Sequence, residues 1–250
     1  MELQETNPKR RSRKRIGFLF FFLCITSLVS DSTFSLKNPL EPPPLRVSSL
    51  EANFQYKNCI IEIYYPKLDS IQGNVSEIIL SRINKTLKKE FFSKRLSNPE
   101  VGCNSDYKQT DPTYYSKITF EVMLNEKKTF SLVMTLTGYL AGAPTPYILK
   151  KGYNFDLRSG YSIFLSDIFR KESGYKSYLD SYITAELLER GILLTPQGFS
   201  DYKNKIEFCL NPKELQLILQ KKGTQPVSVF IPYENLFKYM NQDLFDRETE

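Results

Sequence analysis

Histidine is missing from the whole 250-residue chain, and tryptophan is missing as well. Without histidine, the usual Ser-His and Cys-His forms of nucleophilic catalysis are excluded. The commonest side-chain ligand of transition metals is excluded with them. An enzyme built on this chain would depend on carboxylates, lysine or tyrosine. We expect no catalytic motif of a known kind, no metal site and no cofactor.

The chain also has little excess charge outside its first residues. Its formal net charge is +6, but residues 1–15 hold six basic and two acidic side chains, so that segment carries +4 and the rest of the chain +2. Nucleic-acid binding needs the basic excess on the folded domain itself. The sequence therefore predicts no nucleic-acid partner.

Residues 1–32 have the pattern of a signal peptide. Six basic residues precede an uncharged run of 15 residues, Ile16 to Ser30, and Ser30-Asp31-Ser32 offers a small-x-small cleavage site. The alternative is a retained N-terminal anchor, although a spanning helix needs about 20 apolar residues. Either way we expect an extracytoplasmic protein: periplasmic, secreted or anchored facing outside. Membrane contact is expected only through an uncleaved N-terminal segment.

The remaining chain is predicted to have a linker and two folded parts. Residues 33–48 contain "NPLEPPPL", which is typical of a polyproline-type spacer. An N-terminal subdomain is expected over 49–137 and a C-terminal subdomain over 138–242. Residues 243–250 form an acidic tail.

Hydrophobic periodicity predicts mostly strands with two long helices. One helix is expected over 74–95, where Ile79, Ile83, Leu87 and Phe91 form an apolar stripe. The other is expected over 174–190, where Leu179, Ile183 and Leu187 form a second stripe. The expected strands, followed by a short helix at 233–240, are 50–65, 114–124, 129–141, 147–157, 161–165, 204–210, 214–220 and 226–232. This order indicates an α+β fold of antiparallel sheets with helices packed on one face, in two consecutive β-α-β-β-type halves.

Three cysteines follow the signal segment: Cys59, Cys103 and Cys209. In an oxidising compartment two of them can pair. Cys59 lies on a predicted strand and Cys103 in a polar loop, so we predict a Cys59–Cys103 disulfide. Cys209 is then expected to be a buried thiol, because nothing nearby in the sequence would activate it.

Few residues suggest chemistry. Asp156, Asp167 and Glu207 are the carboxylates in well-defined local settings, but turn and cap hydrogen bonds explain the first two. Tyrosines crowd residues 138–161, after a break that holds two glycines and two prolines. Tyrosine suits sugar and protein surfaces because it joins an apolar ring to a hydroxyl. We take Tyr139, Thr145 and Tyr147 as candidate binding residues; the alternative is that they are ordinary sheet residues.

The stretch "GYLAGAPTPYILKKGYNFDLRSGYSIFLSDIF" (138–169) resembles the signature of a bacterial extracytoplasmic domain: Gly-Gly-Ala-His-Pro, then a strand ending N-F-D-L-x-x-G, then L-x-D-L-F. Residues 60–68 and 83–92 resemble its companion N-terminal domain, and 206–219 and 227–236 its closing strands. The pair occurs in the anti-sigma-V factor RsiV, as a receptor for lysozyme, and beside the deacetylase domain of some peptidoglycan deacetylases.

Two departures limit what this resemblance implies. Ala143-Pro144-Thr145-Pro146 stands where the family has its histidine, so no role of that histidine is carried over. Only 15 residues precede the apolar run and no deacetylase domain follows, so we expect neither sigma-factor signalling nor deacetylation.

The sequence thus predicts an exported, non-enzymatic binding module of the cell envelope. The resemblance implies a lysozyme-like protein or a wall glycan such as peptidoglycan as its partner. Two alternatives stay open: a carboxylate-dependent enzyme of wall polysaccharide, or an accessory subunit of one, and a structural envelope protein.

Overall fold

A computed structural model describes residues 44–56, 59–93, 113–140, 145–192, 206–220 and 225–241. The predicted signal peptide, most of the linker, Cys103 and the acidic tail lie outside these ranges. Within them, no helix has the length and apolarity that a membrane crossing requires.

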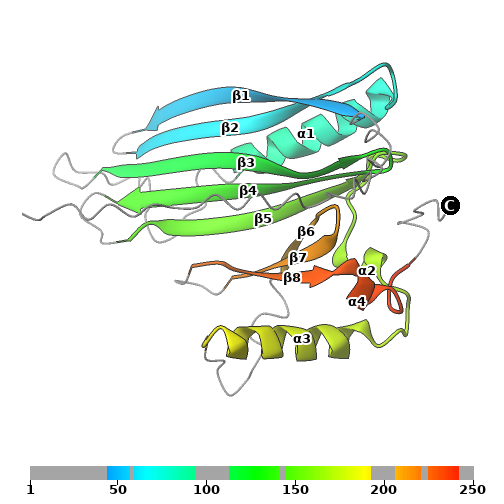
Figure 1. Cartoon of the computed structure of the whole chain (residues 1–250). Helices are drawn as coiled ribbons and strands as arrows, with labels where there is room; N and C mark the ends of the chain where they lie inside the picture. Colours follow the sequence, from blue (N-terminus) through cyan, green and yellow to red (C-terminus); the bar gives the residue numbers. More distant parts are fainter. Residues whose placement is uncertain are drawn as a thin grey trace, which may run out of the picture. The chain divides into compact units, whose positions relative to one another are not determined.

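The chain forms two sheets and four helices within the described residues (Figure 1). A five-stranded sheet has the order β1-β2-β3-β4-β5, and a three-stranded sheet has the order β6-β7-β8. The elements are β1 (Leu45–Tyr56), β2 (Cys59–Ser70), α1 (Glu77–Ser93), β3 (Tyr114–Glu126), β4 (Thr129–Leu140), β5 (Tyr147–Asp156), α2 (Leu165–Ile168), α3 (Tyr175–Glu189), β6 (Glu207–Leu210), β7 (Glu214–Leu219), β8 (Val227–Pro232) and α4 (Tyr233–Leu236).

The α+β class is confirmed, but the N-terminal half differs from the prediction in two ways. The strand expected over 50–65 is a hairpin of β1 and β2, with Tyr56 paired to Cys59. In addition, β2 and β3 pair in parallel, which makes the larger sheet mixed rather than antiparallel. Pro66, expected to end the strand, lies inside β2. It is tolerated there because it follows Ile63, the last residue of β2 paired with β3.

The predicted halves and their boundary also need correction. The element order is β-β-α-β-β-β followed by α-α-β-β-β-α, so the halves are not of one β-α-β-β type. Residues 161–165 do not form a strand, and Ser162 makes a single bridge to Phe155. The predicted boundary at 137/138 falls inside β4, and residues 42–250 form one compact unit. β1 begins at Leu45, inside the predicted linker.

Helix α1 covers one face of the five-stranded sheet, as its apolar stripe predicted (Figure 1). The side chains of Leu80, Ile83, Leu87 and Phe91 are buried on the strands. Their partners across the core include Ile61, Ile63, Ile118, Leu132 and Met134. Burial of this continuous apolar layer is the main source of stability for this half of the unit.

Asn84 fastens α1 to β2 by two hydrogen bonds. Its amide nitrogen donates to the Leu68 carbonyl (2.9 Å), and its oxygen accepts from the Leu68 N–H (2.9 Å). We expect Asn84→Ala to lower the free energy of unfolding by about 2 kcal/mol, because two part-buried backbone groups lose their partners. Urea unfolding checks this, with the exposed Asn53→Ala as control; equal losses would contradict it.

The three-stranded sheet has its own core against α3. Leu179, Ile183 and Leu187 form the buried stripe of α3, again as predicted. The helix ends at Glu189, and Gly191, two residues later, is in a left-handed conformation (φ +70°). The sheet residues that share this core are Phe208, Leu210, Leu215, Leu217, Leu219, Val229 and Ile231.

The other face of the three-stranded sheet packs on the five-stranded sheet through a buried polar contact. The Asn154 amide donates to the Phe208 carbonyl (2.9 Å), and its oxygen accepts from the Ser131 hydroxyl (2.7 Å) and the Leu210 N–H (3.1 Å). The Leu210 N–H also reaches the Ser131 oxygen (3.0 Å). Gly152 lies against the Phe208 backbone: a Cβ there would be 1.8 Å from the Phe208 oxygen. The backbones of β5 and β6 therefore touch where Gly152 has no side chain.

Side chains form hydrogen bonds with backbone groups on the outer edges of β5 and β8. Gln220 accepts from the Lys150 N–H (3.1 Å) and donates to the Ile148 carbonyl (3.0 Å), as a neighbouring strand would on β5. On the outer edge of β8, Arg190 donates to the Ser228 carbonyl (2.8 Å) and Tyr182 to the Phe230 carbonyl (3.3 Å). Paired edge groups are unavailable to another strand.

Candidate functional site

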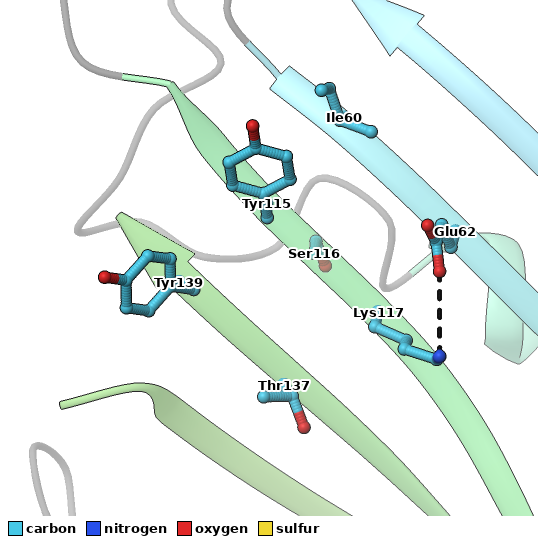
Figure 2. Close-up of a pocket in the computed structure, with 7 residues that line it drawn as sticks. All are labelled: Ile60, Glu62, Tyr115, Ser116, Lys117, Thr137 and Tyr139. Carbon is cyan, nitrogen blue, oxygen red and sulfur yellow. Dashed lines mark ion pairs between the residues drawn. The ribbon is translucent and has the colours of Figure 1, made fainter. Parts of the chain in front are cut away.

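The face of the five-stranded sheet opposite α1 stays open near the start of β3 and the end of β4. A shallow hollow of about 220 Å³ lies there. Successive side chains of a strand point to opposite faces of the sheet. Every second side chain of these strands is therefore buried under α1, and the side chains between them lie on the open face. Its lining residues are Ile60, Glu62, Tyr115, Ser116, Lys117, Thr137 and Tyr139 (Figure 2).

Strand register arranges six of these residues in two rows. Ile60, Tyr115 and Tyr139 are direct neighbours across β2, β3 and β4, and we call them the tyrosine row. Glu62, Lys117 and Thr137 are direct neighbours one pair further along, and we call them the polar row. Figure 2 shows both tyrosine rings side by side on adjacent strands. Tyr115 is 46% exposed and Tyr139 is 41% exposed, which is high for rings on a sheet.

The charges of the polar row balance each other. The Lys117 ammonium lies 3.7 Å from a Glu62 carboxylate oxygen, and both side chains are about half exposed. The same ammonium lies 5.1 Å from the centre of the Tyr64 ring, within range of a cation–π contact. The face therefore offers two tyrosine rings with their hydroxyls beside one cation, one anion and the Thr137 hydroxyl, which suits a neutral ligand with both apolar and polar sides.

The structure separates the three predicted binding residues. Tyr139 lies in the tyrosine row, and Thr145 is an exposed residue just before β5. Tyr147 is paired with Gly138 and packs against the core under α1, so it points to the opposite face from Tyr139. Sequence reasoning missed Tyr115 and Lys117, although the alternation in "YYSKITF" contained the signal that they share a face.

Most of the 138–169 signature has a structural role. The Asp156 carboxylate accepts from the Arg158 backbone N–H (2.9 Å) and its side chain (3.0 Å), which holds the turn before Gly160. Partial burial raises the pKa of Asp156, but the Arg158 hydrogen bonds outweigh it and leave the pKa below its usual value. Asp167 accepts from the Phe164 N–H (2.8 Å) at the start of α2. These two carboxylates therefore serve local turns.

A second polar cluster joins α1 to β5 on the other face. The Lys151 ammonium (2.7 Å) and the Tyr153 hydroxyl (3.1 Å) both donate to one Glu90 carboxylate oxygen. Burial, and then the Glu90 charge, raise the pKa of Tyr153, so its hydroxyl stays protonated. The three groups satisfy one another and hold the helix on the sheet.

The structure describes two of the three cysteines, and only the prediction for Cys209 can be compared with it. Cys59 is fully buried on β2. Because Cys103 lies outside the described residues, their pairing stays a prediction. Cys209 is a free, buried thiol, and burial raises its pKa to about 12. A thiol that stays protonated at neutral pH is a poor nucleophile. Among the described residues, no group of three acidic or cysteine side chains could hold a metal ion.

Comparisons with known proteins place the fold. No family model and no curated protein matches the sequence. The structure is similar to that of a DUF3298-family protein from Bacteroides fragilis, with 16% identity and a TM-score of 0.52 over 83% of this chain and 99% of that one. A DUF3298-family protein from Pseudomonas aeruginosa is 13% identical, with a TM-score of 0.48 over 82% and 97% of the two chains. The chain thus shares the fold of the Bacteroides protein.

Proposed function

We propose that this protein is an exported, non-enzymatic binding module of the cell envelope, and that its open sheet face binds a glycan of the cell wall. The observation that carries this proposal is the exposed cross-strand pair of Tyr115 and Tyr139 beside the polar row. A sugar ring has an apolar face and a polar rim. The tyrosine rings can cover the first, and Glu62, Lys117 and Thr137 can hydrogen-bond to the second.

The envelope setting rests on the predicted signal peptide and on the resemblance to the domain pair of RsiV and of peptidoglycan deacetylases. The same resemblance offers a lysozyme-like protein as the other ligand. We favour the glycan because the hollow is shallow and its charges are paired, whereas a protein partner that resembled lysozyme, a basic protein, would be attracted by unpaired acidic groups.

Binding by the full-length protein tests the proposal directly. Calorimetry with soluble peptidoglycan fragments is expected to detect binding. The double variant Tyr115→Ala/Tyr139→Ala should weaken it by at least tenfold, because both ring faces are lost. The control is Tyr161→Ala, which removes a tyrosine that is 64% exposed but follows the far end of β5.

Lysozyme is titrated in the same way. Binding of lysozyme but of no fragment would contradict the glycan proposal and favour the protein ligand. Fragment binding that is equally strong in the double variant would show that the glycan uses another surface.

A further inference from the structure

We propose that the glycan chain lies across the strands, along the tyrosine row, with one sugar unit on each of β2, β3 and β4. This inference rests on the proposed function and adds the direction of the chain and the number of sugars that the site holds. It follows from the register in which β2, β3 and β4 pair.

The spacing of the row favours this direction. Neighbouring strands lie about 4.8 Å apart, which is close to the advance of one sugar unit along a β-1,4-linked chain. Along one strand, residues on the same face are about 6.8 Å apart. A chain that ran along β3 would also move from the Tyr115 ring onto the charged Lys117 side chain. Only the direction across the strands gives successive sugars successive apolar side chains.

Each strand supplies the same two kinds of contact. On β2 the apolar residue is Ile60 and the polar one is Glu62. On β3 they are Tyr115 and Lys117, and on β4 they are Tyr139 and Thr137. A chain over the tyrosine row thus has the polar row along one of its edges, with one polar side chain per sugar. A repeating ligand fits this repeating pattern.

The row has definite ends, which set its length. Beyond Ile60 the next residue across the sheet is Gln55 of β1, an exposed amide. Beyond Tyr139 no further strand is paired in the described part of the chain, because the register of β4 with β5 ends at Gly138 and Tyr147. Among the described residues, the apolar positions on paired strands of this row number three, and Tyr115 occupies the central one.

The test is a length series of β-1,4-linked N-acetylglucosamine oligomers of one to six units, titrated into the full-length protein by calorimetry, with the peptidoglycan fragments alongside. Affinity is expected to rise about fivefold to tenfold with each unit up to three, since each unit gains one apolar contact. Longer oligomers should add little.

Variants locate the units along the row. In Tyr139→Ala the affinity should stop rising at oligomers of two units, because one terminal apolar position is lost. In Tyr115→Ala the central position is lost, so the gain from length should nearly disappear, while Tyr115→Phe should keep it. Tyr161→Ala should behave as the unaltered protein does.

The outcomes separate this inference from the proposed function. Binding of oligomers or fragments with no dependence on length, or a rise that continues to six units, would overturn the direction and length proposed here while the glycan function stood. Absence of binding to every oligomer and every fragment would overturn both.

Discussion

Replacing Gly152 by alanine is expected to lower the free energy of unfolding by about 3 kcal/mol, because one methyl group would separate two backbones that now touch. The new Cβ would lie 1.8 Å from the Phe208 oxygen and 2.6 Å from its carbonyl carbon. No rotation of a side chain relieves such a contact, so β6 must move away from β5. Urea unfolding measures the loss, and faster hydrogen exchange at the Leu210 amide would show that the sheets have separated.

Gly138→Ala is the matched control, since it is also a strand glycine of the same sheet. Its new Cβ would lie 2.4 Å from the Tyr114 hydroxyl oxygen. That atom is the end of a side chain and can turn aside, so we expect a smaller loss of about 1 kcal/mol. Equal losses for the two variants would show that contact with the Phe208 backbone is not the decisive factor at Gly152.

Asn154→Leu should cost about 3 kcal/mol, because it removes the polar partner that the buried backbone of β6 uses. The Phe208 carbonyl would lose its donor, and the Leu210 N–H and the Ser131 hydroxyl would lose an acceptor. The free energy of unfolding again measures the loss.

A double-mutant cycle with Ser131→Ala sharpens this prediction. The two side chains share one network, so their costs should not add, and the double variant should lose less than the sum of the single variants. Strict additivity would contradict a shared network. Asn53→Ala, which removes an exposed amide bound to Glu51, should change stability by less than about 0.5 kcal/mol.

The elements that depend on local pattern were predictable from the sequence. The stripes of α1 and α3 were confirmed, because apolar residues three and four apart must share a helix face. The strands expected over 114–124 and 129–141 were also confirmed, as the antiparallel pair of β3 and β4. In each case the sequence signal spans fewer than about 20 residues and does not depend on distant parts of the chain.

Features that join distant segments were not predictable. The stretch "ANFQYKNCII", which joins β1 to β2, has neither glycine nor proline, and its two asparagines are too weak a turn signal to divide one long strand into two. The parallel pairing of β2 with β3 requires a crossover connection, and α1, which follows β2 in the chain and precedes β3, makes it by crossing one face of the sheet. The role of Asn154 depends on its contact with β6, which is more than 50 residues away in the sequence.

The candidate site shows the same limit. Tyr139 could be selected because the Gly/Pro break draws attention to its segment. Its partner Tyr115 could not, because their proximity depends on the register of β3 against β4, and the place of Ile60 depends on the parallel pair. The signature that carried the resemblance identifies the turns and the contact between the sheets more than it identifies this surface.

The amide of Gln220 has a consequence for self-association. Because it occupies outer backbone groups of β5, another strand cannot pair along that part of the edge. β1, at the other end of the strand order, has no further strand neighbour among the described residues. If two copies paired through their β1 edges, the joined sheet would have a β5 strand at each end, and Gln220 would occupy backbone groups on both of these outer strands. Growth into a fibre needs two adhesive edges on every copy, and among the described residues Gln220 occupies part of one of the two outer edges of this sheet.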